Sequence, residues 1–402
     1  MYQESYGIVT THIAPARGYG GPAVSVAELA HAWARSGHSI ILCTSDASMG
    51  GRLVVEDLAF HRRVSVRLYR AYWAKRWGFG LGALKQIFSV CRQAKAVYVN
   101  GIATWPTTVG ALCCALLGRR YVVAVRGGLM PRHASDIRAT KPWKWLYYRI
   151  VSIPTLRRAA AIHCASEQEA NGIQELIGSG SKCVIAGNGV NLQTTPLLMS
   201  PTESNLTLCY VGRISQEKGL NEFVRIWSRL RAAKDRLIVL GVGEGEYFLE
   251  FLRMEQSENS GIDYRGYVGI DGVWQALAGS HFLVLPTGLG TRGPCESFGN
   301  SVAQALGAGR PVMVSRGLSW DHIEIEGAGI VFDGNFEAVR AAIERARSTS
   351  AAVWARMAVA ARAYAERELD IQVTAERVMS ALQPASTPNV SAAPRSERRG
   401  QK

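Results

Sequence analysis

The sequence from residue 282 to residue 315 reads FLVLPTGLGTRGPCESFGNSVAQALGAGRPVMVS. The apolar runs at its two ends, FLVLP and PVMVS, have the length and composition of buried strands. Between them, apolar residues recur at helical spacing after SFGN, which occupies residues 297–300. This order of strand, helix and strand is the unit of a parallel sheet. The pattern therefore places SFGN at the carboxyl end of a strand, where open α/β sheets bind ligands.

The same alternation continues in both directions from this stretch. The other strand-like runs are YGIVTTHI, SIILCTS, AVYVN, RYVVAV, AAIHCAS and KCVIAG in the first half of the chain, and LTLCYVG, RLIVLG and IDYRG in the second. Residues 191–206 lose this periodicity and collect Pro, Thr and Ser, which is typical of a linker. We therefore expect two doubly wound α/β domains, residues 1–190 and 207–369, followed by a helix at 370–382 that Asp370 caps, and a disordered tail at 383–402.

Length and composition exclude several classes of protein. The 402 residues are 48% hydrophobic and 19% charged, enough for two buried cores and unlike a disordered chain. No apolar run reaches the roughly 18–20 residues of a transmembrane helix. The eight cysteines lack any C-x-x-C pair, which argues against a disulfide scaffold or a zinc module and predicts buried, reduced thiols. The start of the sequence has no basic segment before its apolar stretch, so we expect no signal peptide and a cytoplasmic protein.

The net charge of +14 lies in the first half of the chain, where residues 1–195 hold 23 Lys and Arg against 9 Asp and Glu. Such an excess indicates an anionic partner or a solvated basic surface. Two stretches, residues 61–77 and 141–149, mix basic with aromatic residues. This mixture suits an anionic membrane surface, a nucleic acid strand, or a helix that buries its aromatic side chains and exposes its charges.

Residues around SFGN have the chemistry of a phosphate or sugar site. The free N–H groups at a helix start can bind an anionic oxygen, and Gly299 allows a ligand to approach the backbone. Glu296 lies just before the helix, and Gln304 lies eight residues after Glu296. At about 1.5 Å per residue they are separated by roughly 12 Å, about the span from the sugar to the ribose of a sugar nucleotide. A second glycine-rich turn, GVGEG at 241–245, with Asp263 after it, is a weak match to a dinucleotide fingerprint because its spacing is G-x-G-x-G.

The pattern from Glu296 to Gln304 resembles the E-x7-E region of the retaining glycosyltransferases of family 4, which have the GT-B fold. Further blocks in the family's order extend the resemblance over most of the chain: GYGGP at 18–22, SEQEA at 166–170, GNGV at 187–190, VGRISQEKGL at 211–220 and Ser319-Trp320-Asp321. The resemblance implies two Rossmann-like domains that face a central cleft. The carboxy-terminal domain would bind the sugar nucleotide and the amino-terminal domain the acceptor, with helix 370–382 packed back on the latter.

The resemblance also implies roles for individual residues. Glu296, Arg213 and Lys218 would be catalytic, the last two by neutralising the diphosphate. The donor-binding set would be Gly20, Gly21, Arg213, Lys218, Gly243, Glu296, Ser297, Phe298, Gly299, Asn300 and Gln304. The sequence departs from the family in having Gln304 for the second glutamate, a longer segment at 287–295, and Arg126 where many relatives have histidine. Arg126 would meet the diphosphate or the acceptor, or pair with a structural carboxylate.

The expected activity is retaining, metal-independent transfer of a sugar, of the hexosyltransferase type, from a UDP-, GDP- or ADP-sugar to a hydroxyl acceptor. The resemblance implies a lipid-linked or polysaccharide precursor as the acceptor, in cell-surface or exopolysaccharide biosynthesis. We expect no cofactor, no metal, since D-x-D and H-x-x-x-H are absent, and no nucleic acid partner. An anionic membrane surface, at the cytoplasmic face of the inner membrane, is the further partner expected. The alternatives are a GT-B sugar-nucleotide epimerase and a non-catalytic relative that only binds sugar nucleotides.

Overall fold

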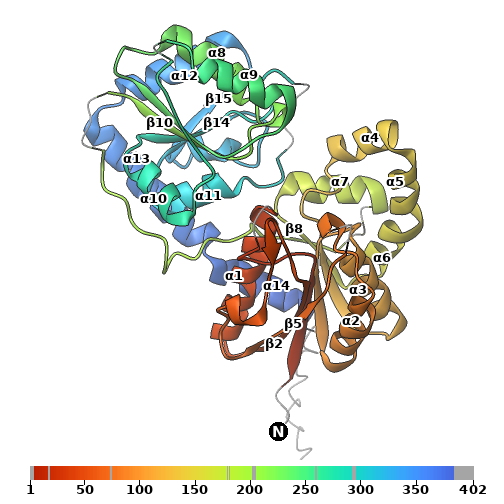
Figure 1. Cartoon of the computed structure of the whole chain (residues 1–402). Helices are drawn as coiled ribbons and strands as arrows, with labels where there is room; N and C mark the ends of the chain where they lie inside the picture. Colours follow the sequence, from red (N-terminus) through yellow and green to blue (C-terminus); the bar gives the residue numbers. More distant parts are fainter. Residues whose placement is uncertain are drawn as a thin grey trace, which may run out of the picture.

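Two parallel sheets, each covered by helices on both faces, make up the protein (Figure 1). The structure, a computed structural model, describes residues 4–16, 19–72, 75–178, 180, 182–201, 205–258, 260–291 and 296–383. The expectation of two doubly wound α/β domains is confirmed. The disordered tail predicted from residue 383 on lies, apart from Gln383, outside the described residues.

The amino-terminal sheet has seven parallel strands in the order β5-β2-β1-β6-β7-β8-β9. Their bounds are β1 Ser5–Thr10, β2 Ser39–Ser45, β5 Val64–Tyr69, β6 Ala96–Asn100, β7 Arg120–Ala124, β8 Ala161–Cys164 and β9 Cys183–Ile185, and β3 Ala47–Ser48 with β4 Gly51–Arg52 forms a small hairpin. The helices are α1 Gly21–Arg35, α2 Gly82–Gln93, α3 Trp105–Leu116, α4 Pro131–Thr140, α5 Pro142–Tyr147, α6 Ile153–Arg158 and α7 Glu167–Ile177, with a π-helical segment η3 at Tyr148–Ser152. Successive strand residues face opposite cores: Ile8 and Tyr98 lie toward α1, whereas Val9 and Val99 lie toward α2 and α3.

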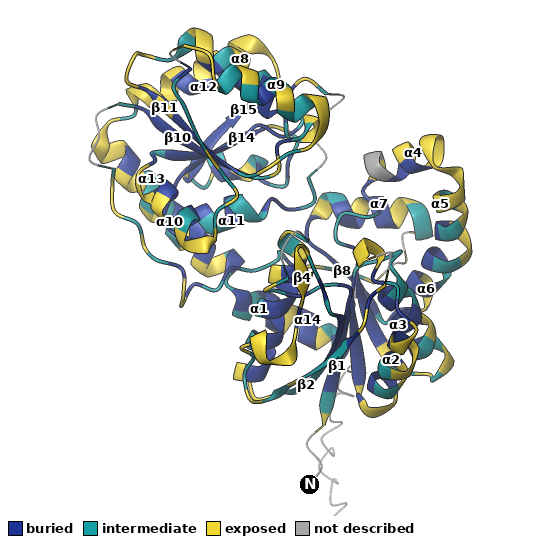
Figure 2. Cartoon of the chain, viewed as in Figure 1, coloured by how far each residue is buried: buried dark blue, intermediate teal, exposed yellow. Residues whose placement is uncertain are grey.

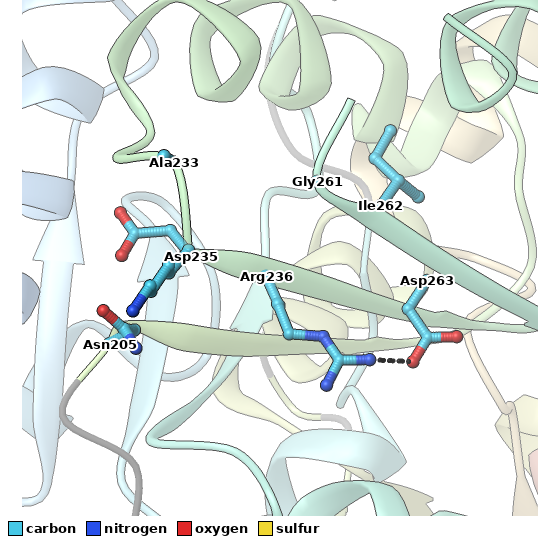
Figure 3. Close-up of a pocket in the computed structure, with 8 residues that line it drawn as sticks. Asn205, Ala233, Asp235, Arg236, Gly261, Ile262 and Asp263 are labelled. Carbon is cyan, nitrogen blue, oxygen red and sulfur yellow. Dashed lines mark hydrogen bonds and ion pairs between the residues drawn. The ribbon is translucent and has the colours of Figure 1, made fainter. Parts of the chain in front are cut away.

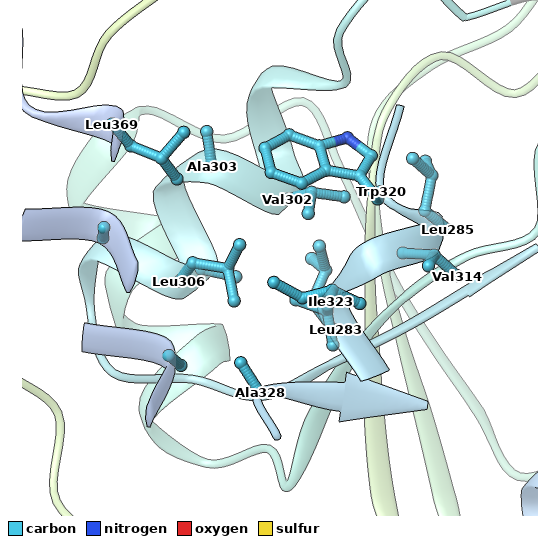
Figure 4. Close-up of a cluster of buried hydrophobic side chains, with 14 of the residues drawn as sticks. Leu283, Leu285, Val302, Ala303, Leu306, Val314, Trp320, Ile323, Ala328 and Leu369 are labelled. Carbon is cyan, nitrogen blue, oxygen red and sulfur yellow. The ribbon is translucent and has the colours of Figure 1, made fainter. Parts of the chain in front are cut away.

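The carboxy-terminal sheet has six parallel strands in the order β12-β11-β10-β13-β14-β15. Their bounds are β10 Thr207–Val211, β11 Arg236–Leu240, β12 Ile262–Gly266, β13 Phe282–Leu285, β14 Val312–Ser315 and β15 Gly329–Phe332. The helices are α8 Leu220–Leu230, α9 Gly245–Glu255, α10 Ile270–Ala278, α11 Asn300–Gly307, α12 Phe336–Ser348 and α13 Ala351–Tyr364. One face packs against α8, α9 and α12, and the other against α10, α11 and α13, where Leu306 and Trp320 fill the core (Figure 4).

The last helix, α14 (Ile371–Leu382), leaves the carboxy-terminal domain and packs beside α1 (Figure 1). Its start is capped by Asp370, whose side chain accepts a hydrogen bond from the Gln372 N–H. Val378 and Leu382 are fully buried in the amino-terminal core. The indole N–H of Trp33 donates to the Ala375 carbonyl at 2.9 Å, so α14 is hydrogen-bonded as well as packed.

In the described part of the basic and aromatic stretch at residues 61–77, for which a helix was one interpretation, the structure has a strand and a short 3₁₀ turn at Lys75–Trp77. β5 takes up Val64–Tyr69 as the edge strand of the amino-terminal sheet, so the helix interpretation is wrong here. The alternation VSVRLY has the period of two that a half-buried strand needs. The other stretch, residues 141–149, is helical, in α5 and η3.

Among the described residues, no helix is both long enough and apolar enough to span a bilayer.

Candidate active site

The predicted site residues follow strands on both sides of the points where strand order reverses. The strand order reverses between β1 and β6 in one sheet and between β10 and β13 in the other. Gly20 and Gly21 follow β1, Arg213 and Lys218 follow β10, and Glu296 follows β13. Ligands of open α/β sheets bind at the carboxyl ends of the strands beside such a switch point.

Lys218 and Glu296, which the sequence separates by 78 residues, form an ion pair in the structure. Only 18% of the lysine side chain and 14% of the glutamate side chain are exposed. A short 3₁₀ turn at Gln216–Lys218 delivers the lysine, and the loop after β13 delivers the glutamate. A cation held beside a carboxylate at this depth is a fixed charge rather than a solvated surface group.

Two glycines allow these loops to approach each other. Gly219 has a φ of 65°, and a Cβ built on it would lie 2.3 Å from the Pro286 carbonyl oxygen. Gly299, at the start of α11, has a φ of 81°, and a Cβ there would lie 3.2 Å from side-chain atoms of Leu285 and Trp320. Both positions combine a left-handed backbone with crowding, so only glycine fits without displacement.

Arg213 is placed at the same edge of the sheet but is held loosely. Its side chain is 65% exposed and pairs with Glu217, four residues further along, at 3.2 Å. An exposed pair of this kind contributes little to stability, so the guanidinium is free to turn toward an anionic ligand. The Tyr210 hydroxyl donates to the Arg213 carbonyl at 2.7 Å and fixes the backbone at this position.

The segment before α11 is not helical, which corrects the distance expected between Glu296 and Gln304. The helix begins at Asn300, residues 296–299 are outside it, and Gly299 is its left-handed N-cap. The helical rise of 1.5 Å per residue therefore does not apply between the two side chains. Gln304 is half-buried within α11. Phe298 is buried with its ring 5.1 Å from that of Trp320, so a ligand could meet only its backbone.

The two domains meet at this site. The Asn188 amide donates to the Asn300 side-chain oxygen at 2.7 Å, across the two domains. A Cβ on Gly21 would lie 2.0 Å from the Asn300 side-chain nitrogen, and one on Gly127 would lie 3.3 Å from Ser297. The start of α1 and the loop after β7 thus face the start of α11.

Arg126 lies at the end of β7, half-buried and with a φ of 50°. Its Nε donates to the Asn100 side-chain oxygen at 2.7 Å, one terminal nitrogen donates to Tyr98 OH at 3.0 Å, and the other donates to the Asn188 side-chain oxygen. These acceptors are neutral. Among the described residues Arg126 has no ion pair with a carboxylate, so the pairing with a structural carboxylate is not found.

A chain of hydrogen bonds continues from Arg126 into the core. The His163 Nε2 lies 2.8 Å from the Ala186 carbonyl, which can only accept, so this nitrogen carries the proton. Tyr98 OH, 2.7 Å from Nδ1, therefore donates to His163 and accepts from Arg126. Burial, helped by the Arg126 charge, lowers the pKa of His163 to about 3 and keeps the imidazole neutral. Sequence reasoning named Asn188 only as part of the GNGV block and missed Tyr98 and Asn100, although Asn100 ends a buried strand, which is the position a ligand-facing residue takes.

The glycine-rich turn at 241–245 is not a dinucleotide site. Gly243 is bridged to Ile214 in the neighbouring loop, and a Cβ on it would lie 2.3 Å from the Ile214 carbonyl oxygen. Asp263, the acidic residue of this weak fingerprint match, lies near the amino end of β12 and pairs with Arg236 and Arg265. Arg265 lowers the pKa of this carboxyl, which is a structural anion.

A cavity of about 540 Å³ lies at the opposite, amino-terminal edge of the carboxy-terminal sheet (Figure 3). Four charged residues line it: Asp235 pairs with Arg347 at 2.8 Å and Arg236 with Asp263 at 3.1 Å, so only Lys234 among them has no ion pair within the described chain. We therefore do not place the site there. The described part of the chain contains no group of three His, Cys, Asp or Glu side chains that could hold a metal ion.

The comparisons with known proteins agree with this geometry. The family model of Glycosyltransferase Family 4 matches residues 19–194, and that of Glycosyl transferases group 1 matches residues 205–348. No curated protein sequence matches the chain.

Solved structures of similar fold include HepE from Anabaena in complex with UDP and glucose, with a TM-score of 0.70 and 15% identity over 94% of this chain and 99% of that one. Sucrose-phosphate synthase from Thermosynechococcus elongatus has a TM-score of 0.70 and 16% identity, covering 94% and 98%. A glycosyltransferase from Rickettsia africae has a TM-score of 0.68 and 15% identity, covering 94% and 98%. Because the two family models match most of the sequence in the family's order and these structures share the fold, the chain belongs to the group 1, family 4 glycosyltransferases and is a glycosyltransferase with the GT-B fold.

Proposed function

We propose that this glycosyltransferase moves a sugar from a nucleoside diphosphate sugar to a hydroxyl acceptor, with retention at the anomeric carbon and without a metal ion. The observation that carries the proposal is the convergence of Lys218, Glu296, Arg213 and the start of α11 at the carboxyl edge of one sheet. Two cations and a helix start supply the positive charge that a diphosphate requires. Structures of similar fold hold UDP or UDP-glucose, which makes UDP-sugars the first donors to test.

In the proposed reaction, the bond between the anomeric carbon and the diphosphate oxygen breaks, and its electrons remain on the diphosphate. Arg213, Lys218 and the N–H groups at the start of α11 stabilise that charge. The acceptor oxygen attacks from the side of the leaving group, and its proton passes to a diphosphate oxygen. No enzymic base is then needed, and Glu296 orients the sugar while it holds Lys218 in place.

The amino-terminal domain is proposed to bind the acceptor next to Arg126. We propose a lipid-linked or polysaccharide precursor, glycosylated at the cytoplasmic face of the membrane during cell-surface polysaccharide synthesis. The support for this assignment is the basic charge of that domain and the position of Arg126 opposite the donor site.

The test is a panel of UDP-, GDP- and ADP-sugars, read by thermal stabilisation and by release of the nucleoside diphosphate, with and without EDTA. We expect one donor to raise the melting temperature and to be hydrolysed slowly, unchanged by EDTA. NMR of the released sugar should show the donor's anomeric configuration. If the donor is converted to another sugar nucleotide in the absence of an acceptor and is not hydrolysed, the protein is an epimerase. If the donor binds but is not turned over, the protein is a non-catalytic relative.

A further inference from the structure

The helices between β7 and β8 carry an apolar face that the core does not use. Trp143, Leu146 and Ile150 are 82%, 44% and 65% exposed. Their spacing of three and four residues places them along one side of α5 and η3. Trp145 and Tyr148, which alternate with them, pack against the amino-terminal core instead. Figure 2 shows α4 and α5 as a largely exposed projection of this domain.

The same helices carry unbalanced positive charge. No Asp or Glu occurs between Asp136 and Glu167. Six exposed basic residues lie in this interval, namely Arg138, Lys141, Lys144, Arg149, Arg157 and Arg158. Within the described residues none of the six makes an ion pair, whereas many arginines of the carboxy-terminal domain do, including Arg225, Arg340 and Arg367. The Lys144 ammonium lies over the Tyr148 ring, 5.6 Å from its centre, and the charges of the other five residues are available to a partner.

We propose that this face, formed by Trp143, Leu146 and Ile150 with Lys141, Lys144 and Arg149 and called the α5 face below, docks on an anionic lipid bilayer. Trp143, Leu146 and Arg149 also line, with Pro142 and Trp145, an open pocket of about 380 Å³. An amphipathic helix with Trp and Leu on one side and Lys and Arg beside them binds at the interface between headgroups and acyl chains. Three apolar side chains are too few to form the buried centre of a stable protein interface.

Docking at the α5 face would help the enzyme to reach a lipid-linked acceptor, and this step rests on the proposed function. Arg126, at the end of β7, is separated by only four residues from the first residue of α4, Pro131. α5 and η3 follow α4 directly, and α6 leads back to β8. A bilayer bound at the α5 face would therefore contact the helices that follow the loop bearing Arg126, on the domain that we propose binds the lipid-linked acceptor.

The experiment is co-sedimentation of the full chain with large vesicles, made either of phosphatidylcholine alone or with about a third phosphatidylglycerol. We expect binding to the anionic vesicles that falls as salt is raised, and little binding to the neutral ones. The variant Lys141→Gln/Lys144→Gln/Arg149→Gln should bind the anionic vesicles about a hundredfold more weakly. Trp143→Ala/Ile150→Ala should also weaken binding, but with less change in its salt dependence.

A matched control removes similar side chains elsewhere on the surface. Ile325 and Val359 are exposed apolar residues of the carboxy-terminal domain, and Lys234 and Arg356 are exposed bases there. Ile325→Ala/Val359→Ala and Lys234→Gln/Arg356→Gln should bind vesicles like the wild type. Brominated lipid should quench tryptophan fluorescence in the wild type, and Trp143→Phe should lose most of this quenching.

Three outcomes would overturn the proposal: equal binding to neutral and anionic vesicles, no loss in the α5-face variants, or vesicle binding that is absent while single-stranded nucleic acid binds the α5 face. Because the readout is sedimentation without any sugar nucleotide, it is independent of turnover. Thermal stabilisation of the same variants by the donor tests the proposed function separately.

Discussion

At the residue scale, the ion pair between Lys218 and Glu296 contributes both to the stability of the fold and to the proposed reaction. We predict that Lys218→Ala lowers donor turnover about 100-fold or more, because a fixed cation at the developing diphosphate charge is lost. It should also destabilise the fold, since Glu296 is then buried without a partner. Glu296→Gln in the Lys218→Ala background should restore the melting temperature but not the turnover.

A suitable control for this variant is Arg253→Ala, which removes an exposed arginine paired with Glu246 on α9. It should leave both turnover and stability unchanged. Undiminished turnover in Lys218→Ala would remove the lysine from the proposed mechanism.

Asn188 tests whether the contact between the domains matters for catalysis. In Asn188→Asp the side chain can still accept from Arg126, but it can no longer donate to Asn300. The Asn300 amide must then turn over to donate its N–H groups to the carboxylate. We predict a fall in kcat of about tenfold or more with a nearly unchanged melting temperature, measured in steady-state assays beside thermal unfolding. Equal kcat in the two proteins would make this contact incidental.

His163 predicts a dependence of stability on pH. Its pKa is about 3 in the folded protein and 6.5 for the free side chain in the unfolded state. Between pH 3 and pH 6.5 the unfolded state therefore binds the proton more readily than the folded state. Stability should therefore fall as pH is lowered from 6.5 toward 3, by about 3 kcal/mol at pH 4 from this group. Urea unfolding of His163→Gln should show a shallower decline over this range. His12, whose pKa burial lowers to about 4, contributes in the same direction in both proteins, so an unchanged slope would contradict the assignment.

At the scale of elements, the site depends on turns that only glycine can form. Gly219→Ala should cost at least about 2 kcal/mol of unfolding free energy, because it adds a clash with the Pro286 carbonyl to a left-handed backbone. Gly118 has a similar φ of 61° but has no atom within 4 Å of a built Cβ. Gly118→Ala should therefore cost only about 1 kcal/mol, from the backbone alone.

Chemical unfolding of the two variants separates the clash from the backbone strain. Equal costs would mean that the loop after β13 moves away from residue 219 without penalty. In that event the position of Glu296 beside Lys218 would not depend on this glycine.

The elements themselves were predictable where apolar periodicity was strong. The strand before the site and the helix after SFGN were both expected, and both are found as β13 and α11. β5 was not, because its aromatic and basic residues equally fit a helix that exposes its charges. Its pairing with β2 decides the matter, and this pairing depends on residues that lie about 25 positions earlier in the sequence.

At the scale of the whole molecule, α14 ties the end of the described chain to the amino-terminal domain. Val378→Asp would bury a charge against α1 and β7 and should lower the free energy of unfolding by roughly 3 kcal/mol or more. Ser380→Asp, two residues away on the exposed side of the same helix, should have almost no effect. Urea unfolding followed by circular dichroism measures both, and similar midpoints would show that the contact of α14 with α1 contributes little.

The sequence alone determined the fold class, the order of most strands and helices, and the family resemblance that led to Arg213, Lys218 and Glu296. These properties follow from local periodicity and from motifs read within short windows. The tertiary structure alone decided which of these residues meet. The ion pair of Lys218 with Glu296 and the hydrogen bonds from Arg126 through Asn188 to Asn300 join segments 62 to 112 residues apart. No local pattern encodes such contacts, because they exist only once two sheets have formed and their carboxyl edges face each other.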